Sequence, residues 1–306
     1  MSSLPGMATT PSPPLRRVLT AMVTPFDAEG RLDLDAAGAL AEHLVDRGVE
    51  GLVLSGTTGE SPTTTGEEKE RLVRTVVDAV GGRAVVIAGV GTYDTAHSVE
   101  LAQQAEKAGA QGLLVVAPYY SKPPQEGLLR HFTTVADATA LPVMLYDIPG
   151  RTGVAIGTET LVRIADHERV VAVKDAKGDL YASSWVLART DLDYYSGDDA
   201  LNLAHLTQGA VGVVSVIAHV VPGECASLVR AVVDGDLPTG IGLHRRLLPV
   251  VRGVMTRTQG VIMAKAGLQL LGLLEHRTVR LPLVEATDDE VALLRGDLAE
   301  SGVHAA

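Results

Sequence analysis

Short apolar runs recur along the chain, separated by longer stretches in which apolar residues lie three or four positions apart. Each run has four to seven residues and is rich in Val, Ile or Leu. Near-continuous apolar runs of this length are typical of parallel strands buried on both faces. The eight runs are Val18–Val23, Gly51–Leu54, Ala84–Ala88, Gly112–Val116, Pro142–Tyr146, Val170–Val173, Leu192–Tyr195 and Val211–Ile217.

The stretches between the runs predict amphipathic helices, as at Asp33–Arg47, Glu67–Val80 and Asp94–Ala108. A glycine follows each of these three stretches, as expected where a helix ends. Run, loop, helix and glycine together form a βα repeat. Eight copies favour an α/β fold of the closed (β/α)8 TIM-barrel type over an open doubly wound sheet.

The repeat ends near Ala218, and the C-terminal part of the chain has a different pattern. Pro222–Val233 is predicted as the eighth barrel helix, and the remainder reads as helices only. We therefore expect a barrel over residues 15–236 and a C-terminal helical appendage over 237–306, preceded by a disordered tail over 1–14. The candidate helices of the appendage are Arg246–Thr256, Ile262–Leu273 and Asp288–Ser301.

Length and charge narrow the function classes. The 306 residues accommodate one barrel, which needs about 250, plus an appendage. The net charge of -11 disfavours nucleic acid as a partner.

No signal peptide or apolar stretch of ~18 residues is found, so no membrane span is expected. The single cysteine, Cys225, fits a buried hydrophobe in a reducing compartment, which predicts a cytoplasmic protein.

Barrel enzymes carry their chemistry at the C-terminal ends of the strands, and Lys174 stands directly after the run Val170–Val173. Lysines such as Lys69 and Lys107 are expected on solvated helix faces. A lysine in a barrel mouth is instead held in a low dielectric, which favours the neutral, nucleophilic amine. The alternative is a structural lysine paired with Asp175 or Asp179.

Tyr146 ends the strand that precedes Lys174 in sequence. Adjacent strands lie ~4.8 Å apart, so the two side chains are expected to meet in the barrel mouth. A phenol beside an imine-forming amine can shuttle protons. A simple packing role for Tyr146 is the alternative.

Three further segments follow predicted strands. Gly56-Thr57-Thr58-Gly59-Glu60 offers backbone N–H groups and hydroxyls to a carboxylate or phosphate but lacks the ending of a P-loop. Arg151, in a loop shaped by Pro and Gly, suits a bidentate carboxylate clamp or is a surface arginine. Tyr119 and Tyr120 either face the site or pack in an interface.

The sequence predicts neither a metal site nor a bound cofactor. The nine histidines show no metal-ligand spacing, and Gly89-Val90-Gly91 lacks the third glycine of a dinucleotide fingerprint. No nucleophile elbow is found. The histidine spacing argues against a zinc-dependent class II aldolase.

Taken together, the chain from about Leu19 to the C-terminal helices resembles the dihydrodipicolinate synthase branch of the N-acetylneuraminate lyase superfamily, and it looks most similar to actinobacterial members. The segments that carry the resemblance are Gly56-Thr57-Thr58-Gly59-Glu60-Ser61-Pro62-Thr63, Pro118-Tyr119-Tyr120, Tyr146-Asp147-Ile148-Pro149-Gly150-Arg151-Thr152, Val173-Lys174-Asp175-Ala176 and Ser196-Gly197-Asp198-Asp199.

The resemblance implies a cofactor-free, Schiff-base-forming lyase that condenses pyruvate with L-aspartate 4-semialdehyde. The product would be 4-hydroxy-tetrahydrodipicolinate, on the route to lysine and diaminopimelate. It also implies a homotetramer built as a dimer of dimers. It implies that Lys174 forms the imine and that Thr57, Tyr146 and a neighbouring subunit's Tyr120 relay protons. Thr57 and Thr58 would bind the pyruvate carboxylate, and Arg151 would bind the carboxylate of the second substrate. Backbone groups near Gly197 and Val214 would complete the pocket.

Two departures from the family pattern stand out. Asp147 replaces an Asn that is common after the tyrosine. The positions that bind the feedback inhibitor lysine in many bacterial members correspond to Gly66, Lys69, Tyr93 and His97. Lys69 would repel a lysine ligand, which predicts weak or absent feedback.

Two other functions remain open at the sequence level. Another pyruvate-dependent aldolase of the superfamily would act on a sugar acid or a 2-keto acid. A non-catalytic sensor barrel would retain the pocket without trapping pyruvate.

Overall fold

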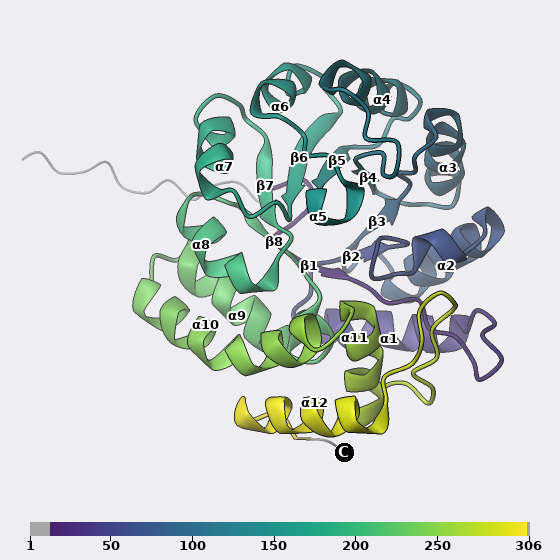
Figure 1. Cartoon of the computed structure of the whole chain (residues 1–306), viewed down its shortest axis with the longest axis vertical. Helices are drawn as coiled ribbons and strands as arrows, with labels where there is room; N and C mark the ends of the chain where they lie inside the picture. Colours follow the sequence, from purple (N-terminus) through teal and green to yellow (C-terminus); the bar gives the residue numbers. More distant parts are fainter. Residues whose placement is uncertain (1–12, 305–306) are drawn as a thin grey trace, which may run out of the picture.

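The computed structural model describes residues 13–304, which form a closed barrel of eight parallel strands inside a ring of helices (Figure 1). Each strand pairs with the next in sequence, and β8 closes the barrel on β1. All eight predicted runs are confirmed to within two residues at either end. The strands are β1 Val18–Ala21, β2 Gly51–Leu54, β3 Val85–Gly89, β4 Gly112–Val116, β5 Val143–Asp147, β6 Val170–Asp175, β7 Asp193–Ser196 and β8 Gly212–Ser215.

The predicted helices form with the expected caps. In α2, for example, Thr65 and Glu68 form a capping box at the start, and Gly81 ends the helix with a φ of 54°. The barrel helices are α1 Leu34–Asp46, α2 Gly66–Val80, α3 Thr95–Lys107, α4 Gln125–Asp137, α5 Pro149–Thr152, α6 Thr158–Ile164, α7 Leu180–Leu187, α8 Asn202–Thr207 and α9 Pro222–Val233.

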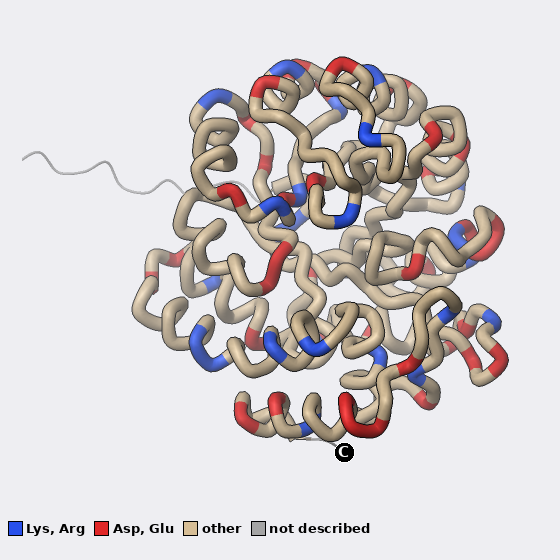
Figure 2. The backbone as a smooth tube through the Cα atoms, viewed as in Figure 1, with Lys and Arg blue, Asp and Glu red and all other residues tan. Residues whose placement is uncertain are grey.

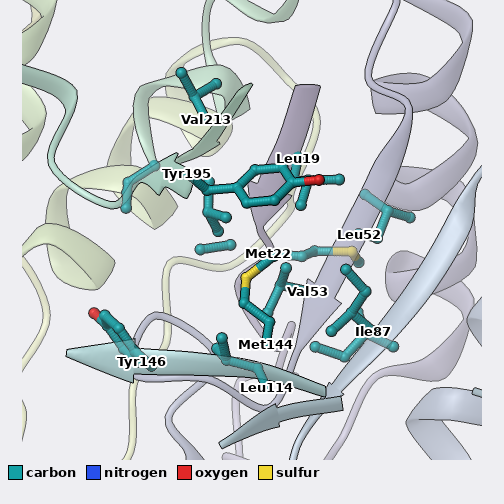
Figure 3. Packing of buried hydrophobic residues seen from close by; sticks show 14 of the residues in the cluster. Leu19, Met22, Leu52, Val53, Ile87, Leu114, Met144, Tyr146, Tyr195 and Val213 are labelled. Carbon is teal, nitrogen blue, oxygen red and sulfur yellow. The ribbon is translucent and has the colours of Figure 1, made fainter. Parts of the chain in front are cut away.

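The barrel interior is a packed apolar core. Leu19, Met22, Leu52, Met144 and Tyr195 converge there from different strands and strand ends (Figure 3), and each is buried. The outer faces of the strands are covered by helices. Burial on both faces explains why the strands read as continuous apolar runs instead of alternating ones.

The C-terminal subdomain contains α10 Leu237–Val251, α11 Gly260–Leu270 and α12 Asp288–Glu300. The predicted start of its first helix at Arg246 is wrong, because α10 begins at Leu237 and continues into a π-helical segment over Arg252–Thr256. Gly240 and Gly242 weaken the helical signal. Gly240 packs closely on α9, where a Cβ would lie 3.0 Å from the side chain of Val232.

The helical appendage and the gap between its second and third candidate helices are confirmed. Between α11 and α12 the chain forms an irregular loop that returns to the barrel mouth beside α2 (Figure 1). Gly272, with a φ of 71°, lies where α11 gives way to this loop. The loop matters for function, because Pro282 and Leu283 reach the cavity described below.

The surface carries mixed charge. Acidic and basic positions both occur around the outer helices in the view of Figure 2. Among the described residues, no helix is long and apolar enough to cross a membrane. Cys225 is buried, as predicted, and burial raises the pKa of its thiol. Most of the predicted tail, residues 1–12, lies outside the described residues.

Candidate active site

A cavity of about 490 Å3 opens at the carboxyl ends of the strands, where a barrel enzyme carries its chemistry. Its walls come from the segments that follow β2, β3, β4 and β5, together with the C-terminal subdomain. Thr57, Tyr120, Tyr146 and Arg151 of the predicted site line it. The other lining residues are Ser55, Gly56, Glu60, Ser61, Pro62, Thr63, Gly89, Gly91, Leu114, Val116, Tyr119, Ile148, Thr152, Gln259, Pro282 and Leu283.

Lys174 and Tyr146 meet as the sequence predicts. Their Cα atoms are register partners on β6 and β5, and the Lys174 ammonium nitrogen lies 4.1 Å from the centroid of the Tyr146 ring. Lys174 is 5% exposed. The amine therefore lies over the phenol ring of Tyr146, which itself lines the cavity.

The alternative of a structural, paired Lys174 finds no support. In residues 13–304 the lysines that form ion pairs are Lys177 and Lys265, and Lys174 is not among them. Asp175 instead accepts hydrogen bonds from the Lys177 N–H and the Ser183 hydroxyl. Successive strand residues point to opposite faces, so Asp175 faces the helices while Lys174 faces the barrel interior.

Gly197 makes room for the lysine stem. A Cβ at this position would lie 2.9 Å from the Lys174 Cγ, and the Gly197 N–H donates to the Asp175 carbonyl over 2.7 Å. Val214 is buried in β8 beside Leu19. Four predicted residues, Lys174, Thr58, Gly197 and Val214, are not among the residues that line the cavity.

The loop that carries Thr57 and Thr58 is a tight turn. Ser55 and Glu60 adopt left-handed backbone conformations with φ of 52° and 53°. A Cβ on Gly59 would lie 2.9 Å from the backbone nitrogen of Ser55. The Thr24 hydroxyl donates to the Gly59 carbonyl over 2.7 Å. Thr57 therefore faces the cavity from a backbone with little freedom.

On the opposite side of the cavity, Arg151 lies in the short helix α5, which local contacts hold. The Thr152 hydroxyl donates to the carbonyls of Ile148 and Val154, and Gly153 ends the helix with a φ of 76°. Arg151 is exposed and lines the cavity. A guanidinium in this position has the donors to bind a carboxylate through two parallel hydrogen bonds.

Asp147, the departure noted in the sequence, braces this second loop. Its carboxylate accepts a hydrogen bond from the Ile156 N–H over 3.1 Å and pairs with Lys177 over 3.2 Å. The residue is 1% exposed, and burial raises its pKa. Sequence reasoning gave Lys177 no role, because nothing local indicates that it reaches the neighbouring strand end.

The expectation that Lys69 lies on a solvated helix face is wrong. Its ammonium donates to the carbonyls of Ser61 and Thr64 at 2.8 and 2.5 Å, and burial lowers its pKa to about 8. Helix side chains point back toward the N-terminus, so a lysine in the first turn of α2 folds onto the preceding loop. Lys107 is exposed, as expected.

Comparison with known proteins identifies the family. The model of the dihydrodipicolinate synthetase family matches residues 14–300. The chain is 66% identical over 296 residues to the 4-hydroxy-tetrahydrodipicolinate synthase of Kineococcus radiotolerans, covering 97% of this chain and 96% of that one.

Solved structures agree in fold. The dihydrodipicolinate synthase of Aquifex aeolicus superposes with a TM-score of 0.91 at 37% identity, covering 94% of this chain and 99% of that one. The chloride-inhibited dihydrodipicolinate synthase of Acinetobacter baumannii, solved in complex with pyruvate, gives 0.91 at 31% identity with the same coverage. The chain belongs to the dihydrodipicolinate synthetase family.

Proposed function

We propose that this protein condenses pyruvate with L-aspartate 4-semialdehyde through an imine on Lys174, forming 4-hydroxy-tetrahydrodipicolinate. The observation that carries the proposal is the unpaired Lys174 amine, 4.1 Å from the Tyr146 ring at the edge of the cavity. Family membership and the name of the 66% identical relative support the same reaction. A sugar-acid aldolase finds no comparable support.

In the first half-reaction, the Lys174 amine attacks the keto carbon of pyruvate and water leaves. The oxygen that departs needs protons, which the hydroxyls of the cavity-lining residues Tyr146 and Thr57 can relay. Thr57 and Thr58 would hold the pyruvate carboxylate in the turn that follows β2. Gly197 and Val214 would complete the pocket around the lysine with their backbone groups.

In the second half-reaction, the pyruvate methyl carbon loses a proton to give an enamine, which attacks the aldehyde carbon of the second substrate. Arg151 would hold that substrate's carboxylate, because a guanidinium binds a carboxylate through two parallel hydrogen bonds. The substrate's amino group then displaces Lys174 from the imine carbon. This step closes the ring and regenerates the free amine.

We also propose that the active unit is a homotetramer, a dimer of dimers in which Tyr120 enters the relay of a neighbouring subunit. Tyr120 is 92% exposed in the single chain although it borders the cavity. It lies in the loop after β4 with a left-handed backbone, at a φ of 72°. Analytical ultracentrifugation tests the assembly, and a monomer with full activity would contradict it. The cytoplasmic location remains a prediction.

Borohydride trapping tests the mechanism directly. The protein is incubated with pyruvate, reduced, digested and analysed by mass spectrometry. We expect a reduced pyruvate adduct on the peptide that contains Lys174, and condensation in an assay with aspartate semialdehyde. Lys174→Ala should abolish both, whereas Lys107→Ala, on the exposed face of α3, should retain both.

The two readouts separate the possible failures. An adduct without condensation would retain the imine mechanism and reject the proposed second substrate. A folded wild-type protein that forms no adduct would reject the mechanism itself.

A further inference from the structure

Glu60 ends the loop that carries Thr57 and Thr58, and two residues of the C-terminal subdomain hold it. One carboxylate oxygen accepts a hydrogen bond from the Lys265 ammonium over 2.6 Å, and the other accepts one from the Arg280 backbone N–H over 2.8 Å. The partners lie 205 and 220 residues further along the chain. We call Glu60, Lys265 and Arg280 the Glu60 clasp.

Lys265 is fully buried, which a lysine rarely is unless its charge is paired. Its ammonium also donates to the Thr278 carbonyl over 2.7 Å and lies 4.2 Å from the centroid of the Phe26 ring. Burial lowers the pKa of Lys265 to about 8. A buried ion pair is weak evidence for added stability, because apolar residues of similar volume often serve as well. The position in which the ion pair holds Glu60 is therefore more informative about its role than its contribution to stability.

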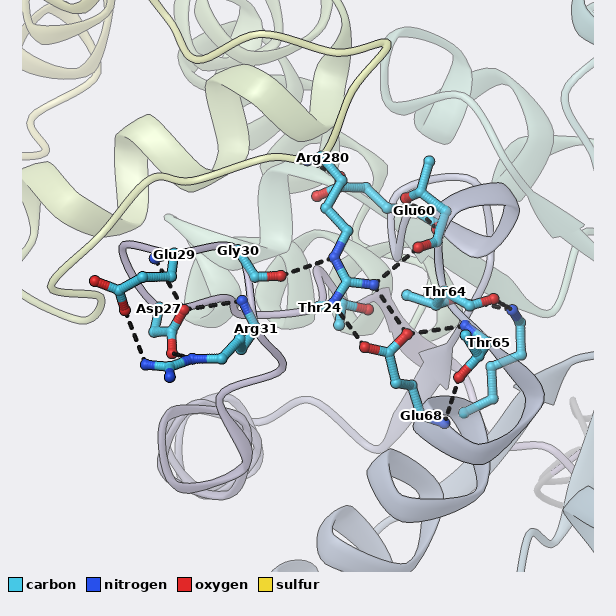
Figure 4. A network of polar contacts seen from close by, with 12 residues as sticks. Thr24, Asp27, Glu29, Gly30, Arg31, Glu60, Thr64, Thr65, Glu68 and Arg280 are labelled. Atoms are coloured by element: carbon cyan, nitrogen blue, oxygen red, sulfur yellow. Dashed lines mark hydrogen bonds and ion pairs between the residues drawn. The ribbon is translucent and has the colours of Figure 1, made fainter.

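Arg280 extends the clasp along the same loop. Its guanidinium donates to the carbonyls of Thr63 and Gly30 and to the Glu68 carboxylate, at 2.8, 2.9 and 2.6 Å. Figure 4 shows this guanidinium between Gly30 and Glu68. The segment from Glu60 to Glu68 is thus fixed at both ends by one stretch of the C-terminal subdomain.

Movement at Glu60 would be passed to Thr57 through the turn. The Glu60 N–H donates to the Thr57 carbonyl and the Ser61 N–H donates to the Gly56 carbonyl, both over 3.2 Å. Glu60 has a left-handed backbone, which a non-glycine residue adopts only under constraint from its surroundings. The clasp supplies that constraint.

We infer that Lys265 and Arg280 are positioning residues for pyruvate, which hold Glu60 so that Thr57 and Thr58 are aimed at the substrate carboxylate. The inference rests on the proposed function, because that function supplies the carboxylate that the loop binds. It assigns the C-terminal subdomain a part in binding pyruvate. In this role Lys265 acts through Glu60 and the turn.

The test is Lys265→Met. We expect the pyruvate concentration that gives half-maximal borohydride trapping, and the pyruvate KM, to rise about tenfold or more, since small displacements at a reacting centre have effects of this size. The KM for aspartate semialdehyde should change less than about twofold, because Arg151 lies on the separate loop after β5.

A second variant separates positioning from folding. Lys265→Met leaves Glu60 buried without its cation, so the double variant E60Q/K265M removes the charge as well. We expect the double variant to regain most of the lost Tm while the pyruvate KM remains raised. If the Tm and the pyruvate KM both returned to wild-type values, the inference would be overturned, because the only role of Lys265 would then be to neutralise Glu60.

Arg252→Met is the matched control. Arg252 pairs with Asp297 and Glu300 within the same subdomain, so its loss should lower Tm without changing the pyruvate KM. Wild-type protein that traps no pyruvate would reject the proposed function. Trapping by Lys265→Met at the wild-type half-saturation would reject only the positioning role.

Discussion

The two loops that face each other across the cavity are held in different ways. The pyruvate-side loop, Ser55–Glu60, depends on partners more than 200 residues away, namely Lys265 and Arg280. The loop that carries Arg151, Ile148–Gly153, is held by the hydroxyl of its own Thr152, and we call it the acceptor-side loop after its proposed substrate. Just beyond it, the Ile156 N–H donates to Asp147, which pairs with Lys177. One side of the site is built by tertiary contacts and the other mostly by local sequence.

The difference follows from what each loop has to do. A short turn with left-handed residues at Ser55 and Glu60 is strained, and such a conformation persists where its surroundings hold it. The role proposed for the acceptor side requires one guanidinium on a short helix, which Pro149 starts and Gly153 ends. We therefore expect substitutions on the two sides to change different kinetic parameters.

The largest effect is expected from Gly59→Ala. The added Cβ would lie 2.9 Å from a backbone nitrogen that cannot move without shifting the turn. The value of kcat/KM for pyruvate should fall about hundredfold or more. Gly150→Ala, on the acceptor side, meets nothing within 4 Å and should remain near wild type in steady-state kinetics. Equal losses in the two variants would remove the contrast between the loops.

Arg151→Met should raise the KM for aspartate semialdehyde about tenfold to hundredfold, because the variant loses a charged bidentate contact. Half-saturation of borohydride trapping by pyruvate should stay unchanged. A parallel rise in both constants would show that Arg151 serves both substrates.

Lys177→Met tests the brace of the acceptor-side loop. It leaves Asp147 buried without its cation, and we expect a loss of about 2 kcal/mol in the free energy of unfolding. The raised pKa of Asp147 limits the cost, since the carboxyl can take up a proton. Arg74→Met removes an exposed pair with Glu70 and should cost less than about 0.5 kcal/mol in the same denaturation experiment.

Glu68→Gln tests the ion pair that Arg280 of the Glu60 clasp forms with the first turn of α2. Hydrogen bonds from Arg280 lower the pKa of Glu68 from 4.5 to about 2. The lowered pKa contributes stability that is fully present above pH 4.5 and lost as the pH falls toward 2. Wild type should exceed the variant by about 2 °C in Tm at pH 7, and the gap should narrow from pH 4.5 downward. A constant gap would contradict the linkage.

The smallest expected effect is that of free lysine. With pyruvate near its KM, submillimolar lysine should leave the rate unchanged. The carbonyls of Ser61 and Thr64 hold the Lys69 ammonium in place, and its positive charge would repel the lysine ligand. Inhibition in this range would refute the prediction. Lys69→Met serves as the comparison, since sensitivity gained on losing the ammonium would assign the resistance to Lys69.

The accuracy of the sequence predictions varies with the distance over which each contact acts. The strands and the meeting of Lys174 with Tyr146 were predictable, because a parallel barrel places neighbouring strand ends side by side. The burial of Lys69 and the role of Lys177 were not, since a lysine on a helix or loop reads as solvated until its neighbours are known. The start of α10 at Leu237 was hidden by two glycines within the helix.

The sequence by itself determined the barrel, the family and the residues proposed for the chemistry, because strand periodicity and motif order are written locally along the chain. Only the tertiary structure decided that an irregular loop near Arg280 and the buried Lys265 would close on Glu60. No local pattern encodes a contact across more than 200 residues. That contact exists because the closed barrel and its helical subdomain bring Glu60, after β2, next to Lys265 on α11 and Arg280 in the loop that follows it.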